Sequence, residues 1–244
     1  MSLLFRTNSI GWLAAVGCGA WLCLGLLFAA RASGQEPRVL ADEVREYEVL
    51  VKDKPVGKML TRISDLDDGT AIAATDTDFK IETWYHKYHY EFHGRELWRG
   101  GHLIRVDNHV VDDGKKRGAH ATVSERGSVI ELPGAKPQAV PKLAVTTNYW
   151  RLPEIPPGTN NLAIMESGTG SVDTGWFKRV GQEKIIIDGR TIECTHFRVV
   201  GAAKTELWFD ERARLVRQLT VEEGYPAEIH LTRIHNNTPV GEAQ

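Results

Sequence analysis

Three histidines, His86, His89 and His93, fall within eight residues of the stretch from Thr83 to Trp98. Imidazole binds zinc and serves as a general acid or base, so this cluster is the first candidate for chemistry. On a helix the three side chains would follow i, i+3, i+7 and share one face. They would then be candidate metal ligands of a metal-dependent or hydrolytic enzyme, with an Asp or Glu supplied by a neighbouring segment.

The composition of the stretch favours a β-strand instead. Threonine, tryptophan and four further aromatic residues, at positions 85, 88, 90 and 92, are typical of strands. In a strand His86 faces away from His89 and His93, and those two lie about 13 Å apart at 3.3 Å per residue. Two imidazoles at that separation cannot share one zinc ion. We therefore expect the aromatic side chains to face a core and the histidines to face water, with the metal site as the alternative.

Other patterns exclude several kinds of site. Asp65 and Asp67 are followed by Gly69 at the fifth position, whereas a calcium loop of the EF-hand type needs glycine at the sixth. The segment from Glu166 to Ser171, "ESGTGS", lacks both the G-x-S-x-G of a nucleophile elbow and the G-K-[ST] of a phosphate loop. No serine–histidine–aspartate triad is indicated, and no cofactor is expected.

Aromatic residues are the more informative signal. Five tryptophans lie beyond residue 34, which is many for a chain of this size. They could pack a core, or they could line a cavity inside a curved sheet. We take Trp84, Trp98, Tyr149 and Trp150 as candidate ligand-binding residues.

The elements that must position these residues are strands. Almost every segment beyond Glu43 alternates β-branched or aromatic residues with polar ones, and Asp68-Gly69 and Asp188-Gly189 are strong hairpin signals. One short helix is expected around residues 141–152. The pattern predicts an all-β, mainly antiparallel domain over residues 43–235, a single strongly curved sheet or open barrel, with a two-sheet sandwich as the alternative. Residues 236–244 are expected to be a disordered tail.

Residues 1–34 differ sharply from the rest. Arg6 precedes an uncharged run, and Ala30 and Ala32 are placed as a cleavage site, so the segment predicts an export signal peptide. Residues 10–30 carry no charge and are long enough to be an uncleaved membrane anchor helix instead. Both interpretations predict an exported protein, periplasmic or extracellular, and the second adds a contact with the cytoplasmic membrane.

Charge and cysteine content narrow the class further. The whole chain carries 30 basic and 32 acidic residues, and without residues 1–34 the basic count falls to 28. There is no basic block, so a nucleic-acid partner is not expected. Cys194 is the only cysteine beyond residue 34, which excludes an intramolecular disulfide there and predicts a small buried side chain.

Four segments resemble an uncharacterised family of exported bacterial proteins classed as a domain of unknown function. They are "VLVKDKPVG", "WRGGHL", the "YW" of Tyr149 and Trp150, and "LWFDERARLV", where Ala213 replaces a common glycine. The resemblance spans Val44 to Ile234 and implies a β-rich, exported, single-domain protein. More loosely, the strand pattern is similar to the curved sheets of periplasmic lipoprotein carriers, an analogy of fold alone.

Three functions fit these observations. The first is a non-enzymatic binding module of the cell envelope for a lipid, another apolar ligand or a polypeptide. The second is the metal-dependent or hydrolytic enzyme that uses the clustered histidines. The third is a structural component of an envelope assembly with a protein partner. Export, strand periodicity and the tryptophans favour the first.

Overall fold

The structure, a computed structural model, describes residues 38–82, 84, 87–155, 158–201, 204–222 and 225–237. All of them belong to the compact unit Pro37–Gln244, and only this unit is considered below. Residues 1–34, for which an export signal or membrane anchor is expected, lie outside the described residues. None of the described residues forms a helix long and apolar enough to cross a membrane.

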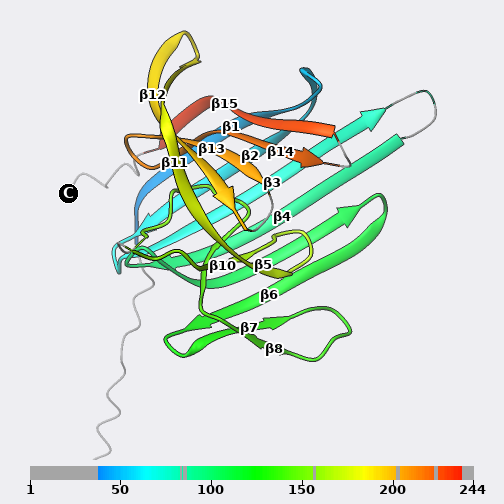
Figure 1. Cartoon of the computed structure of the whole chain (residues 1–244), viewed down its shortest axis with the longest axis vertical. Helices are drawn as coiled ribbons and strands as arrows, with labels where there is room; N and C mark the ends of the chain where they lie inside the picture. Colours follow the sequence, from blue (N-terminus) through cyan, green and yellow to red (C-terminus); the bar gives the residue numbers. More distant parts are fainter. Residues whose placement is uncertain are drawn as a thin grey trace, which may run out of the picture. The chain divides into compact units, whose positions relative to one another are not determined.

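Fifteen strands and no helix make up the described residues (Figure 1). The strands are β1 (Val39–Val51), β2 (Lys54–Leu66), β3 (Thr70–Glu82), β4 (Lys87–Arg99), β5 (His102–Asp112), β6 (Lys115–Ser124), β7 (Gly127–Glu131), β8 (Gln138–Val140), β9 (Leu143–Thr146), β10 (Leu162–Met165), β11 (Val172–Ile187), β12 (Arg190–Val200), β13 (Thr205–Asp210), β14 (Leu215–Glu222) and β15 (Tyr225–Asn237).

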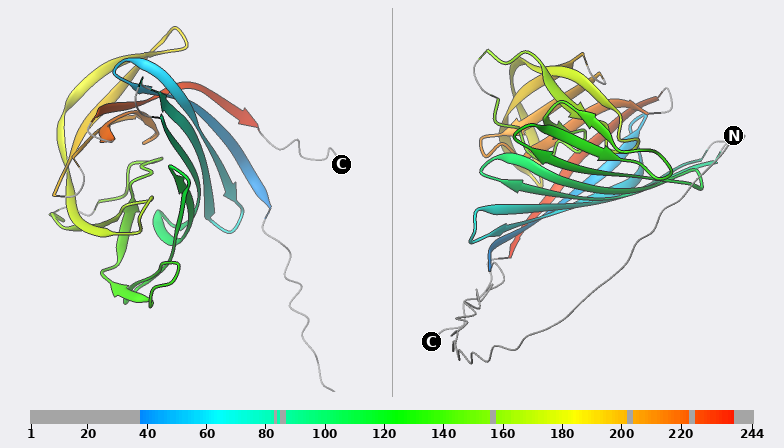
Figure 2. Two further views of the ribbon diagram at one scale, coloured as in Figure 1. Left: turned by 90° about the vertical axis from the view of Figure 1, so that its right-hand side faces the viewer. Right: turned by 90° about the horizontal axis from the view of Figure 1, so that it is seen from below.

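A single sheet contains all fifteen strands, in the order β8-β7-β6-β5-β4-β3-β2-β1-β15-β14-β13-β12-β11-β10-β9. Neighbouring strands are antiparallel except β9 and β10, which are parallel. The sheet curls round on itself, as the end-on view in Figure 2 shows. The prediction of one curved, mainly antiparallel sheet is therefore confirmed, and the sandwich alternative is wrong.

The two edges of this sheet are neighbours along the chain. β8 ends at Val140 and β9 begins at Leu143, so only two residues separate the first edge from the last. The backbone N–H of Leu143 donates to the Ser128 hydroxyl of β7 at 2.8 Å. The chain itself thus brings the edges together, and the sheet becomes a nearly closed barrel whose last gap is spanned by side chains.

Turn chemistry explains the hairpins. Asp188 and Gly189, between β11 and β12, both have positive φ (48° and 73°), as a two-residue hairpin turn requires. Asp113 and Gly114 do the same between β5 and β6, with φ of 48° and 79°. Asp68-Gly69 lies in the turn between β2 and β3. The predicted hairpins are confirmed.

Two expectations need correction. Residues 141–152 contain β9 and a turn rather than a helix. The segment is held at both ends by distant parts of the chain instead of by its own helical hydrogen bonds: Leu143 N–H donates to the Ser128 hydroxyl, and Leu152 N–H donates to the Ala213 carbonyl at 2.9 Å. At the C-terminus, β15 continues through Asn237, so residues 236 and 237 belong to a strand. Residues 238–244 lie outside the described part of the chain.

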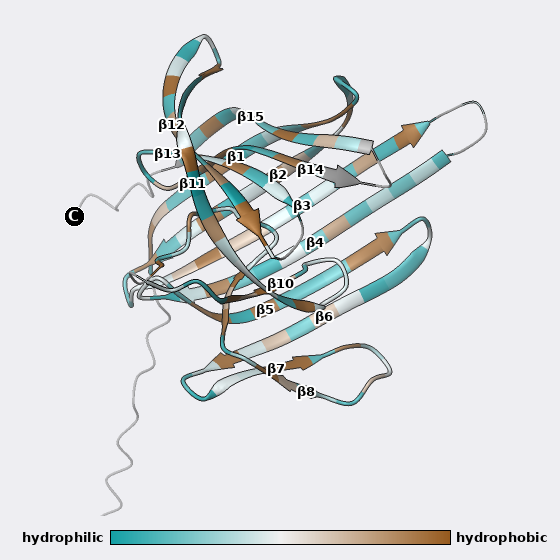
Figure 3. Ribbon diagram, in the orientation of Figure 1, coloured by the Kyte–Doolittle hydropathy of each residue, from teal (hydrophilic) through white to brown (hydrophobic). Residues whose placement is uncertain are grey.

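Hydrophobic and hydrophilic residues alternate along the strands (Figure 3), and the buried hydrophobic residues form one core cluster. On β4 the inward side carries Tyr88, Phe92 and Trp98, all at most 6% exposed. His89 and His93 point to the other side, which is solvated. The alternation predicted for this stretch is therefore confirmed.

Candidate functional site: a cavity inside the barrel

A cavity of about 420 Å³ occupies part of the barrel interior. One wall is aromatic and aliphatic, because β3 and β4 present their inward side chains there. Phe79 stacks on Tyr90 with ring centroids 5.1 Å apart, and it meets Tyr88 at 5.9 Å. The apolar wall is completed by these further residues: Met59, Phe92, Val110 and Ile229.

The facing wall is polar, and much of it comes from the loop between β10 and β11. Glu166 organises this loop, since its carboxylate accepts hydrogen bonds from Gly168 N–H at 2.8 Å and Thr169 N–H at 2.6 Å. The Glu166 carbonyl also accepts from Gly170 N–H at 2.8 Å. The short "ESGTGS" segment is thus a rigid turn that presents polar atoms to the cavity.

Ser167 is one of the residues of this polar wall. Its residue is only 5% exposed, and its Oγ has no hydrogen-bond partner among the described residues. Its backbone carbonyl accepts a hydrogen bond from the Asn108 side-chain amide at 3.1 Å. A buried hydroxyl without a partner costs free energy. Because this oxygen has almost no accessible surface, a ligand in the cavity would reach it only after the side chain rotates.

Further polar side chains surround the cavity. Thr205 and Gln218 of β13 and β14 line it and are 3% and 8% exposed. Asp112 and Arg117 lie at its boundary and form an ion pair at 2.7 Å. The cavity therefore combines an aromatic wall with several hydrogen-bonding groups and one ion pair.

The four aromatic residues selected from the sequence lie elsewhere. Trp84, in the connection between β3 and β4, is 94% exposed. Trp98, Tyr149 and Trp150 are at most 5% exposed and belong to the core. None of the four lines the cavity described above.

Trp98 and Trp150 are held by a buried acid, Glu96. Both indole N–H groups donate to Glu96 Oε2 at 2.9 Å. The Thr146 hydroxyl and the Asn148 amide donate to Oε1. Glu96 is 1% exposed, and the four hydrogen bonds use the acceptor capacity of both its oxygens. This network fastens residues 146–150 to β4 and is structural.

Tyr149 is fully buried next to Phe177, and its backbone has a positive φ of 44°. Burial raises the pKa of its hydroxyl well above the ordinary value, and the nearby Glu166 carboxylate raises it further. The phenol therefore stays protonated and does not act as a base at neutral pH.

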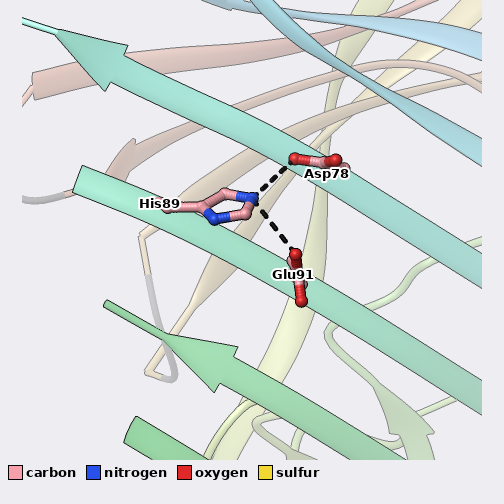
Figure 4. A group of neighbouring side chains, drawn as sticks. All are labelled: Asp78, His89 and Glu91. Carbon is pink, nitrogen blue, oxygen red and sulfur yellow. Dashed lines mark hydrogen bonds and ion pairs between the residues drawn. The ribbon is translucent and has the colours of Figure 1, made fainter. Parts of the chain in front are cut away.

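The histidine cluster is partly described. His86 lies outside the described residues. His93 Nδ1 contacts Asp76 at 2.6 Å, and His89 Nε2 contacts Asp78 at 2.9 Å (Figure 4). Both pairs are on the outer face of the barrel, so they are separated from the cavity by the sheet.

The sequence analysis did not select the cavity residues, but the spacing of three of them is a signal in the sequence. Tyr88, Tyr90 and Phe92 follow each other at every second position, which indicates one aromatic strand face. Glu96 shares that face, and an acid on a core-facing side predicts a buried carboxylate with several donors. Ser167 carried no such signal, because its partners, Asn108 of β5 and Thr147, are distant in sequence.

A family model for a domain of unknown function, DUF6134, matches residues 47–232. The chain belongs to this family. The resemblance drawn from the sequence to a family of unknown function is thereby confirmed. No protein in a search of the curated proteins matched the chain.

Solved structures show the same kind of fold. A β-barrel-like protein of domain of unknown function DUF1849 from Brucella abortus is similar with a TM-score of 0.60 at 6% identity, over 82% of this chain and 99% of that one. An outer membrane lipoprotein-sorting protein domain from Vibrio parahaemolyticus covers 83% of this chain and 88% of its own at 9% identity, with a TM-score of 0.27. The first similarity supports the β-barrel-like fold, and the second carries no argument.

Proposed function

We propose that this DUF6134 protein is a non-enzymatic binding module that holds one small amphiphilic or apolar ligand, such as a lipid, inside its barrel. The observation that carries the proposal is the cavity of about 420 Å³ between an aromatic wall and the polar residues of the β10–β11 loop. Pockets for small molecules commonly measure about 300–1,000 Å³ and combine apolar walls with a few placed polar groups.

The two walls predict how such a ligand binds. Its apolar part would pack on Phe79, Tyr88 and Tyr90, where burial of apolar surface stabilises the complex. Its polar end would take hydrogen bonds from the β10–β11 loop and from Thr205 and Gln218 on the polar wall. A cavity of this size accepts a small molecule and is too small for a polypeptide segment with several side chains, so we favour the lipid-like ligand over a polypeptide.

The expected export of the chain fits this role. If residues 1–34 direct the protein out of the cytoplasm, the ligand would be an envelope component. If the segment remains as an anchor, binding would occur at the membrane. If it is cleaved, binding would occur away from the membrane.

The proposal is tested by filling the cavity. Thr220 lines it from β14, and a Thr220→Trp substitution would place an indole in the ligand's space. We expect binding of the apolar fluorophore 1-N-phenylnaphthylamine to fall by at least about tenfold, or about 1.4 kcal/mol. Native mass spectrometry of protein from its own cells should show a bound small molecule that this variant lacks.

The matched control is Thr191→Trp, at an exposed position beside the turn of the β11–β12 hairpin. This variant should bind the fluorophore as the unaltered protein does. Equal binding by Thr220→Trp and the unaltered protein, with both folded by circular dichroism, would refute the interior cavity as the binding site.

A further inference from the structure

His89 differs from the other histidines in how it meets acids. Six described histidines lie within ion-pair distance of a carboxylate, and for His89 two carboxylates meet the same nitrogen. Asp78 Oδ1 is 2.9 Å from Nε2, and Glu91 Oε1 is 3.3 Å from it (Figure 4). A ring nitrogen carries at most one hydrogen, so it cannot donate in line to both acids.

His196 provides the comparison. It also contacts two carboxylates, but Glu183 meets Nδ1 at 3.0 Å and Glu206 meets Nε2 at 2.6 Å. Each nitrogen there has its own acid, so a protonated ring satisfies both. At His89, by contrast, both carboxylates contact the same nitrogen, Nε2.

The backbone register fixes this convergence. Asp78 of β3 and Glu91 of β4 are directly opposite each other, and like charges in that position repel. His89 is two residues from Glu91 and shares its face. Lys58 of β2 is opposite Asp78 on the other side, but among the described residues its ammonium forms no ion pair with either acid. A cation between the acids would remove the repulsion.

The distances match those between ligands of one metal ion. Imidazole and carboxylate ligands lie about 2.1 Å from zinc, so two ligand atoms at 90–109° are separated by about 3.0–3.4 Å. The observed 2.9 Å and 3.3 Å agree with this spacing. The three ligand atoms all lie within 4.8 Å of one another, so a side-chain rotation would complete the set.

We propose that Asp78, His89 and Glu91 bind a divalent transition-metal ion of the zinc class on the outer face of β3 and β4. One imidazole with two carboxylates favours zinc over magnesium or calcium, which prefer oxygen ligands alone. Three protein ligands leave positions open to water or to a further ligand. A hollow of about 320 Å³ beside Asp78 and Glu91 gives access to those positions.

The metal site does not depend on the cavity proposal, because the sheet separates them. The test is isothermal titration of tag-free, full-length protein in detergent with zinc chloride after removal of metals by a chelator. We expect saturable binding of one zinc ion per chain and no heat from magnesium or calcium. Bound zinc should also raise the melting temperature, since it binds the folded chain.

Three variants locate the site. His89→Ala, Asp78→Asn and Glu91→Gln should each weaken zinc binding by at least about tenfold, because each removes a ligand. The control is His235→Ala, which removes an exposed histidine that meets one acid, Glu46, at 2.9 Å. It should keep the affinity of the unaltered protein. Absence of saturable zinc binding, or unchanged binding in folded His89→Ala protein, would overturn the proposal.

Discussion

Glu96 shows what a single buried residue contributes to this barrel. Its carboxylate accepts four hydrogen bonds, two of them from the indoles of Trp98 and Trp150. Glu96→Gln replaces one acceptor oxygen by an NH₂ donor, which then faces donors. We expect the free energy of unfolding to fall by about 3 kcal/mol. Urea denaturation followed by tryptophan fluorescence measures this loss.

The control for this substitution is Glu125→Gln, in the exposed turn between β6 and β7. Its effect should stay within about 0.5 kcal/mol of zero. A Glu96→Gln protein as stable as this control would mean that the carboxylate does not hold residues 146–150 in place.

Cys194 allows a second test at the residue scale. Burial raises the pKa of its thiol to about 11, and the Asp210 and Glu183 carboxylates add to the shift. At pH 8 about one thiol in a thousand is then thiolate, the form that reacts with iodoacetamide. We expect the Cys194 peptide to remain unlabelled in folded protein and to be labelled in urea, by mass spectrometry. Rapid labelling of the folded protein would contradict the burial.

Local alternation was enough to predict which side chains of β4 point inward. Period two is a property of the strand alone, so Tyr88 and Phe92 inside and His89 outside follow from the sequence. The sequence does not show which of the inward residues border the cavity and which pack against other side chains. Trp98 meets Glu96 and Trp150 in a packed network, whereas Tyr90 faces the cavity, and the difference is made by residues more than 50 positions away.

At the scale of elements, the β13–β14 turn contains an alanine with a left-handed backbone. Ala213 has a φ of +60°, a conformation that disfavours a Cβ atom, and its N–H donates to the Asp210 carbonyl at 3.0 Å. Glycine would remove that strain at the cost of a more flexible unfolded chain. We expect Ala213→Gly to raise the free energy of unfolding by roughly 0.5–1 kcal/mol.

Urea denaturation again gives the measurement. The control is Ala139→Gly, on the exposed edge strand β8, where extended backbone gives glycine no such advantage. That variant should be slightly less stable than the unaltered protein. Destabilisation by Ala213→Gly would show that strain at this turn is offset by contacts of the alanine side chain.

Hairpins were predictable because their signals are adjacent residues, as with Asp188-Gly189. The helix expected over residues 141–152 was wrong for the opposite reason. The segment is held by hydrogen bonds to distant partners: Leu143 N–H donates to Ser128, the Thr146 hydroxyl to Glu96 and Leu152 N–H to Ala213. Tertiary hydrogen bonds determine the conformation of this segment, and its own sequence does not indicate which distant residues are the partners.

For the whole molecule, closure has a simple origin in the chain. The sheet's edges, β8 and β9, are joined by two residues, and this short link forces a curved sheet to meet itself. Evenly spaced strands in the sequence predicted a curved sheet or an open barrel, but the order of the strands in the sheet could not be predicted. The interior volume follows from that order, so the cavity could be expected only as a possibility of the fold class.

The barrel as a whole should lose stability in acid, because carboxylates with a lowered pKa must be protonated there. Two of them, Asp107 of β5 and Glu228 of β15, lie on strands far apart in the sheet. Burial alone would raise the pKa of Asp107 and Glu228. Hydrogen bonds from Arg105 and His120, and from Arg217 and His230, outweigh it and hold both pKa values below the ordinary range. The folded chain therefore binds fewer protons than the unfolded chain near pH 4, and the free energy of unfolding falls as pH falls through that region.

Arg217 tests this cause directly. It contacts Glu228 at 2.8 Å and packs over the Trp208 ring at 4.8 Å. Arg217→Met keeps apolar packing but removes the charge, so the pKa of Glu228 should rise toward its ordinary value. We expect the free energy of unfolding to fall by about 1 kcal/mol at pH 7, a small loss because the partly exposed pair is screened by solvent. The loss should shrink toward pH 3, because Glu228 becomes protonated there. Lys184→Met, which removes an exposed pair with Glu193 at 3.7 Å, should leave the pH profile unchanged. Parallel profiles for Arg217→Met and the unaltered protein, measured by urea denaturation from pH 3 to 7, would show that Glu228 owes its lowered pKa to other groups.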